Sequence, residues 1–108
     1  MAKLEKKIKG NFDEILKKIE DGILSGSTSA TLEDKSDFKS KTGRCSVRVF
    51  ERYSYMGGNR VSLNVTLFQS DDETIRLSAI TSGGSRALFF KVNTIGEDAF
   101  LDKLKQIL

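Results

Sequence analysis

The sequence predicts an α+β fold of two layers, in which two helices cover one face of an antiparallel sheet. Three observations lead to this prediction. Three segments alternate apolar and polar residues, two segments carry apolar residues at helical spacing, and the helical segments lie near the two ends of the chain. The predicted element order is β-α-β-β-β-β-α, in one domain over residues 1–108.

The first predicted elements are a short edge strand and a helix. Residues 2–9 alternate between an apolar side and a lysine-rich side, and Lys6 breaks the pattern. Asn11 then caps a helix, with Glu14 three residues later as in a capping box. The apolar face of this helix consists of Phe12, Ile15, Leu16, Ile19, Ile23 and Leu24. Residues 25–27 are expected to end it.

The middle of the chain predicts antiparallel strands with one buried face. A weak strand is expected near residues 27–32, and residues 32–43 are expected to form a long polar loop or a mobile connection between strands. Three stronger strands are expected near residues 44–53, 60–68 and 74–80. Their buried faces are expected to carry Cys45, Val47, Val49, Glu51, Tyr53, Val61, Leu63, Val65, Leu67, Ile75, Leu77 and Ala79.

Strand register and a second helix complete the predicted architecture. Three-residue turns at both hairpins would place Val49 opposite Val65 and Val65 opposite Leu77. Near the C-terminal end, Thr94 and Glu97 form another capping box. The apolar face of this helix consists of Phe100, Leu101, Leu104, Ile107 and Leu108. Residues 88–92 fit either a further strand or the continuation of the strand before them.

Arginines recur at every fourth residue in one of the predicted strands. Arg44, Arg48 and Arg52 share one side of a strand, because side chains alternate and positions four apart point the same way. We expect this stripe on the exposed face of the sheet. The predicted interaction face consists of Arg44, Arg48, Phe50, Arg52, Arg60, Asn64, Phe68 and Arg76.

Several interpretations of the surfaces stay open at this stage. Exposed aromatic residues can bring two sheets together in a homodimer, and aromatic residues among basic ones can bind single-stranded nucleic acid. A solvated strand face without a ligand gives the same pattern. A cavity between sheet and helices, with Glu51, Tyr53 and Tyr55 as polar groups, is a further possibility for a small ligand.

A glycine bend is a second candidate site. Ser82, Gly83, Gly84, Ser85 and Arg86 could form an anion nest from successive backbone N–H groups. The alternative is a bend that only redirects the chain, which is the commonest use of glycine.

Composition argues against catalysis and against a membrane span. The chain has no histidine, which excludes a Ser–His–Asp triad and removes the commonest metal ligand. We therefore expect no enzyme, no metal and no cofactor. The longest apolar run, residues 87–90, is too short to cross a membrane, so no membrane partner is expected. A single cysteine excludes an internal disulfide, and with no signal-like start the chain is expected to be cytoplasmic.

Three stretches resemble a group of small bacterial proteins that have no assigned activity. They are VFERYSYMGGNRVSLNVTL, ITSGGS and GEDAFLDKL. The resemblance implies a compact bacterial domain and no catalytic residue. The predicted element order also resembles the TATA-binding-protein-like folds, in topology only. The sequence thus predicts a non-enzymatic binding domain, with a homodimer as the leading partner and single-stranded nucleic acid as the alternative.

Overall fold

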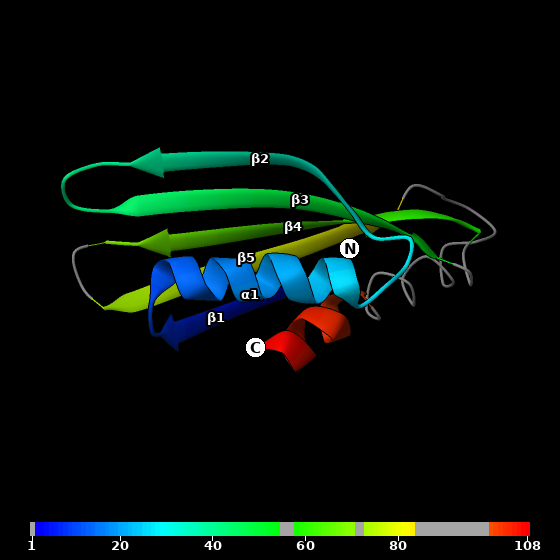
Figure 1. The fold of residues 1–108 in the computed structure, drawn as a ribbon, viewed down its shortest axis with the longest axis horizontal. Helices are drawn as coiled ribbons and strands as arrows, with labels where there is room; N and C mark the ends of the chain where they lie inside the picture. The colour runs from blue at the N-terminus through cyan, green and yellow to red at the C-terminus, as the bar shows by residue number, and fades with distance from the viewer. Residues whose placement is uncertain (1, 55–57, 71–72, 84–99) are drawn as a thin grey trace.

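The computed structural model describes residues 2–54, 58–70, 73–83 and 100–108. The strands among these residues form one antiparallel sheet in the spatial order β1-β5-β4-β3-β2 (Figure 1). Along the chain the elements are β1 Lys3–Lys9, α1 Phe12–Ser25, β2 Thr31–Lys39, β3 Arg44–Ser54, β4 Asn59–Gln69 and β5 Thr74–Gly83, then a C-terminal helix described over residues 100–107. The predicted α+β fold and its element order are confirmed.

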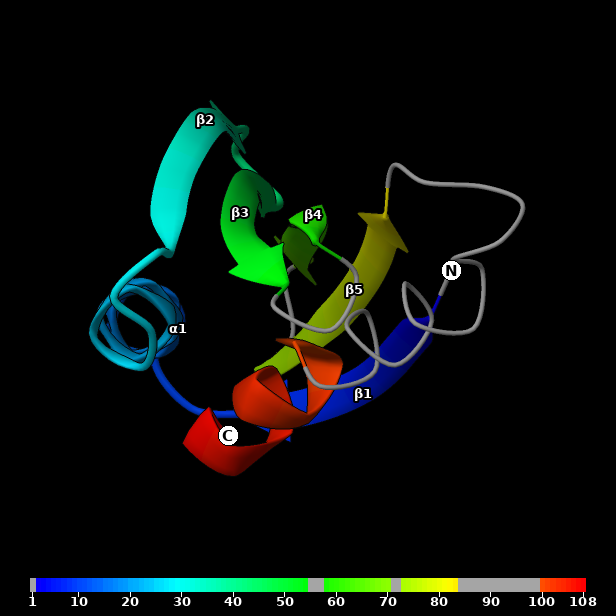
Figure 2. The ribbon, with the colours of Figure 1, turned by 90° about the vertical axis from the view of Figure 1, so that its right-hand side faces the viewer.

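Both helices lie on the same side of the curved sheet (Figure 2). We call this side the helix face and the other side the open face. The core between sheet and helices consists of Phe12, Leu16, Ile19, Ile23, Phe50, Val61, Leu63, Val65, Leu67, Ile75, Leu77, Ala79, Phe100, Leu101 and Leu104. The prediction for β4 and β5 is therefore confirmed, because every apolar side chain that it placed in the core is buried.

Local sequence explains the position of α1. The Asn11 side chain caps the helix by accepting a hydrogen bond of 3.0 Å from the backbone N–H of Glu14. At the other end, the backbone N–H of Gly26 donates to the carbonyl of Gly22. A Cβ on Gly22 would lie 2.7 Å from Ile107, so this glycine allows the C-terminal helix to approach α1 closely.

The face prediction for β3 is wrong. Phe50, Arg48 and Ser46 are buried on the helix face, with 0 %, 5 % and 1 % of their surface exposed. Val47 and Val49, which were expected in the core, lie on the open face and are only partly buried. The same reversal moves Cys45, Glu51 and Tyr53 to the open face and turns Arg44 and Arg52 toward the helices.

Turn length accounts for the reversal. The pairing of Ser54 with Asn59 leaves four residues in the hairpin instead of the three expected. One extra residue shifts the register by one and turns every side chain of the strand to the other face. Arg48 and not Val49 is thus opposite Val65. In the next hairpin Val65 pairs with Ala79 and not with Leu77, a shift of two residues that keeps the predicted faces.

The segment expected to be a long loop is largely a strand. β2 pairs with β3 from Thr31 to Lys39, with a bulge between Leu32 and Asp34, and the hairpin is closed by a hydrogen bond of 2.8 Å from the Ser40 N–H to the Gly43 carbonyl. The sequence of β2 shows no alternation of apolar and polar residues, because both sides of this edge strand are mostly polar.

Two expectations about secondary structure fall on residues outside the described part of the chain. These are the assignment of residues 88–92 and the Thr94–Glu97 capping box. Among the described helices, none is long and apolar enough to span a membrane.

Candidate functional site

The open face is the surface that the described elements leave uncovered. Its side chains come from alternate positions of all five strands and align in rows across the sheet. The Phe68 row is Lys7, Arg76, Phe68, Cys45 and Phe38, in the order β1-β5-β4-β3-β2. The Thr66 row is Glu5, Ser78, Thr66, Val47 and Ser36. The Asn64 row is Lys3, Ile80, Asn64, Val49 and Asp34.

Large apolar side chains collect on the open face. Phe38 and Phe68 are 65 % and 45 % exposed, and Ile80 and Tyr53 are 39 % and 38 % exposed. Val47 and Val49 are partly buried and lie in the Thr66 and Asn64 rows of this face. Among the described residues, the other large apolar side chain with comparable exposure is Leu24, which lies on α1. The open face therefore carries four of the five large apolar side chains that are exposed in the described part of the chain.

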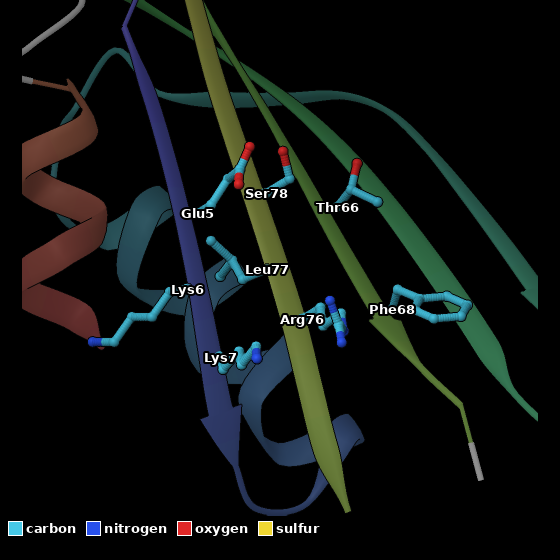
Figure 3. A pocket seen from close by; sticks show the side chains of 8 residues that line it. All are labelled: Glu5, Lys6, Lys7, Thr66, Phe68, Arg76, Leu77 and Ser78. Atoms are coloured by element: carbon cyan, nitrogen blue, oxygen red, sulfur yellow. The ribbon is translucent and has the colours of Figure 1, made fainter. Parts of the chain in front are cut away.

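Phe68 separates two shallow hollows. The first has a volume of about 440 Å³ and is lined by Arg76, Thr66 and Ser78 and by side chains of β1. Figure 3 shows Arg76 beside Phe68 in this hollow, with Thr66 and Ser78 further along the neighbouring strands. The second hollow, of about 340 Å³, lies between Phe68, Cys45 and Phe38.

Charges on the open face are unevenly paired. Lys3 lies 3.1 Å from Glu5, and Arg60 lies 2.9 Å from Glu51. Arg76 and Asp34 form no ion pair within the described part of the chain, and the same holds for Lys7 and Lys9. Positive charge is thus concentrated on β1, and the opposite edge strand, β2, carries Asp34, a carboxylate without an ion pair among the described residues.

The arginine stripe does not belong to this surface. Arg48 donates to Glu20 of α1 at 2.6 Å, and it contacts both carboxylate oxygens of Asp37 at 3.0 and 3.3 Å. Ser46 also donates to Asp37, at 2.6 Å. We call Arg48, Glu20, Asp37 and Ser46 the Arg48 cluster. It ties α1 and β2 to β3 on the helix face.

The Arg48 cluster changes the pKa values of its members. Hydrogen bonds from Ser46 and Arg48 lower the pKa of Asp37 below its usual range. Burial acts to lower the pKa of Arg48, but the hydrogen bonds to Glu20 and Asp37 together outweigh it and raise that pKa. Arg48 is therefore a permanently charged structural anchor.

The two other arginines of the stripe also contact helices. Arg44 pairs with Asp13 at 2.8 Å and lies 4.0 Å from the centre of the Phe12 ring. Arg52 lies over the Phe100 ring at 4.6 Å, and burial lowers its pKa. Of the predicted interaction face, Arg44, Arg48, Phe50 and Arg52 thus belong to the helix face. Arg60, Asn64, Phe68 and Arg76 lie on the open face.

Acidic residues on α1 were the signal that the sequence analysis missed. Asp13 and Glu20 are seven residues apart, or about 10 Å along a helix, and Arg44 and Arg48 are about 13 Å apart along a strand. Opposite charges at similar spacings favour an arrangement in which the arginine-bearing side of the strand faces the helix. Phe38 was missed because β2 was not recognised, and Val47 and Val49 were missed because of the register.

The remaining predicted sites are not assembled by the described residues. Glu51 and Tyr53 lie on the open face, so they cannot line a cavity between sheet and helices, and Tyr55 lies outside the described residues. In the glycine bend, Ser82 and Gly83 end β5, and the Ser82 hydroxyl lies 2.7 Å from that of Ser62. Gly84, Ser85 and Arg86 lie outside the described residues.

Comparisons with known proteins identify a family but no activity. The chain belongs to DUF6054, a family of unknown function, whose model matches residues 1–108. A search of curated proteins and a search of solved structures each gave no match. The bacterial origin and the resemblance to TATA-binding-protein-like folds stay predictions. The described residues hold no group of three or more potential metal ligands.

Proposed function

We propose that this member of DUF6054 is a non-enzymatic binding domain that acts by self-association, with the open face as its interface. One observation carries the proposal. Phe38, Phe68, Ile80 and Tyr53 are exposed together on one face of the sheet, while the apolar residues of the opposite face are buried under two helices. Apolar surface concentrated in this way is typical of protein interfaces.

The size of the open face fits a stable homodimer. Five strands of seven to eleven residues, about ten on average, at a spacing of about 4.8 Å cover about 24 by 33 Å, or about 800 Å². A standard interface buries about 800 Å² on each partner. Sheets also pack face to face in β-sandwiches, where their inner side chains form a common core.

The charges favour a second copy of the chain as the partner. Lys7 and Lys9 lie on the β1 edge of the open face and Asp34 lies on the β2 edge, and none of the three forms an ion pair within the described residues. A surface with opposite charges at opposite edges can complement itself in a two-fold dimer. The absence of histidine from the sequence supports binding rather than acid–base chemistry near neutral pH.

Sedimentation equilibrium of two matched variants tests this proposal. Phe68→Gln removes an exposed aromatic ring from the open face, and Leu24→Gln removes an exposed apolar side chain from α1. We expect Phe68→Gln to raise the dimer Kd at least about thirtyfold, as for an interface residue worth about 2 kcal/mol. Leu24→Gln should leave the Kd unchanged. Equal effects of the two variants, or a monomeric wild type, would contradict the proposal.

Single-stranded nucleic acid is a second candidate partner for the same face. The observation in its favour is the Phe68 row, where an exposed ring adjoins Arg76 and Lys7, neither of which forms an ion pair within the described residues. Rings that stack on bases beside cations that contact phosphates are typical of such proteins.

Fluorescence anisotropy with a short labelled single strand decides between the two candidates. If the face binds nucleic acid, Arg76→Ala should reduce the salt dependence of log K by about 0.7, the value for one phosphate contact on a single strand. If the face forms only a dimer, the wild type should not bind the strand at low salt.

A further inference from the structure

We infer that two copies pack face to face about a two-fold axis that runs along β4. The inference rests on the proposed self-association and adds the geometry of the interface. β4 is the central strand of the sheet, with β5 and β1 on one side and β3 and β2 on the other. Rotation about this axis places β4 over the partner's β4, β5 over the partner's β3, and β1 over the partner's β2. Each row of the open face then faces the same row of the partner.

Apolar side chains meet one another in this arrangement. Phe68 lies on the axis and faces the partner's Phe68, which allows an aromatic pair. In the Asn64 row, Ile80 faces the partner's Val49, and the contact occurs twice because the interface is symmetric. Phe68, Ile80 and Val49, which are exposed or partly exposed in a single copy, thus gain apolar neighbours in the dimer.

Polar and charged residues are also matched. Asn64 faces the partner's Asn64, and two carboxamides can donate to and accept from each other. At the edges of the same row, Lys3, which also lies 3.1 Å from Glu5 of its own strand, faces the partner's Asp34, which has no ion pair within the described residues of its own chain. In the Phe68 row, Lys7 faces the partner's Phe38, where a cation can lie over the ring.

The alternative axis, at right angles to the strands, gives a poorer match. It would exchange the Phe68 row with the Asn64 row about the Thr66 row. Lys7 would then face the partner's Lys3, and Phe68 would face the partner's Asn64. Like charges at the edge and a polar residue against the central ring disfavour this arrangement.

Sheet twist leaves the proposed contacts within reach. Packed sheets are rotated by about 30° relative to each other, so the axis lies about 15° from the direction of each β4 strand, and the edge strands are displaced by about 5 Å at about 10 Å from the axis. Neighbouring rows are about 7 Å apart, two residues along a strand. The displacement is smaller than the row spacing, and a lysine side chain can cover it.

Charge reversal at the edge strands tests the axis. We expect Lys3→Glu and Asp34→Lys each to raise the dimer Kd about tenfold, since two symmetric pairs become repulsive. The double variant should restore the wild-type Kd. Lys9→Glu is the matched control, because it reverses a charge on the same strand and face but has no carboxylate opposite, so it should not be rescued by Asp34→Lys.

Cross-linking locates the axis independently of charge. In a Cys45→Ser background, Ser62→Cys places a thiol on β4, and Ser82→Cys places one directly opposite it on β5. A thiol on β4 meets its own copy, whereas thiols on β5 are separated by about two strand spacings, or about 10 Å, along the interface. A short bis-maleimide should therefore link the Ser62→Cys dimer and leave the Ser82→Cys dimer unlinked.

The outcomes separate this inference from the proposed function. A monomeric wild type overturns both. A dimer that depends on Phe68, but shows no rescue by charge reversal or links through residue 82, keeps the proposed function and overturns the axis along β4.

Discussion

Nε of Arg48 on β3 donates a hydrogen bond of 2.6 Å to Oε1 of Glu20 on α1. Arg48 also holds Asp37 of β2, so one buried guanidinium joins α1, β2 and β3. The carboxylates remain partly exposed, with 29 % of the Glu20 side chain and 53 % of the Asp37 side chain accessible. The arginine stripe therefore holds the edge of the sheet to its helix, and the interface that we propose lies on the opposite face.

The stability of the fold should depend on Arg48. Arg48→Ala should lower the free energy of unfolding by about 2–4 kcal/mol, since it removes a buried ion pair and leaves a cavity, although the released carboxylates can reach water. Arg76→Ala is the control, because Arg76 is exposed on the open face, and it should change stability by less than about 0.5 kcal/mol. Urea denaturation measures both. Equal, small effects would mean that Arg48 is solvated.

Two phenylalanines test the face assignment of β3. Phe50→Ala should cost about 3–5 kcal/mol, because Phe50 is fully buried on the helix face. Phe38→Ala should change the stability of the monomer by less than about 0.5 kcal/mol, because Phe38 is exposed on the open face of the neighbouring strand. Thermal or urea unfolding at low protein concentration compares them. The reverse order of the two costs would show that β3 has the opposite face toward the helices.

Acid should weaken the link between β2 and β3. The pKa of Asp37 is lower in the folded chain than in the unfolded chain, because Ser46 and Arg48 donate hydrogen bonds to its carboxylate. Its contribution to stability is complete above the unfolded pKa, near 3.9, and is lost as the pH falls through the lower folded value. The free energy of unfolding should thus decrease below about pH 4.

Two asparagine variants test whether Asp37 causes this loss of stability at low pH. Asp37→Asn should be less stable than the wild type at pH 7 and should lose less stability on acidification. At a protein concentration at which the chain is monomeric, so that Asp34 has no contact with the partner's Lys3, Asp34→Asn should keep the wild-type slope, because Asp34 forms no ion pair within the described residues of its own chain. Identical slopes for all three proteins would exclude Asp37 as the source.

The single cysteine can report whether the open face is covered. Cys45 lies in the Phe68 row between the rings of Phe38 and Phe68. In the wild type, its rate constant for maleimide labelling should fall as the protein concentration rises past the dimer Kd. In Phe68→Gln the rate constant should be higher and nearly independent of concentration. A wild-type rate constant that is unaffected by concentration would contradict the proposed interface.

The strong patterns in the sequence predicted most of the architecture. Asn11 and Glu14 correctly marked the start of α1. In β4, Val61, Leu63 and Val65 alternate with small polar residues. Only one side of this strand is therefore apolar enough to face the core. These elements were predictable because local propensity and hydrophobic pattern agree.

The site was harder to predict because β3 has apolar residues on both sides. Val47 and Val49 compete with Phe50, and only the hairpin length and the carboxylates of α1 decide which side faces the core. The hairpin length and the ion pairs with α1 both depend on how β3 contacts other elements. The alternation of residues within β3 alone carries no information about those contacts. The polar composition of β2 likewise gave no hydrophobic pattern, so Phe38 could not be assigned to a strand.

The most direct test of the central claim is the mass of the wild-type protein in solution. Sedimentation equilibrium from low to high micromolar concentration should show a monomer of 12.0 kDa that converts to a particle of twice that mass. The same series with Phe68→Gln should stay near the monomer mass. A wild type that remains at 12.0 kDa over the whole range would contradict the claim that the open face binds a second copy of the chain.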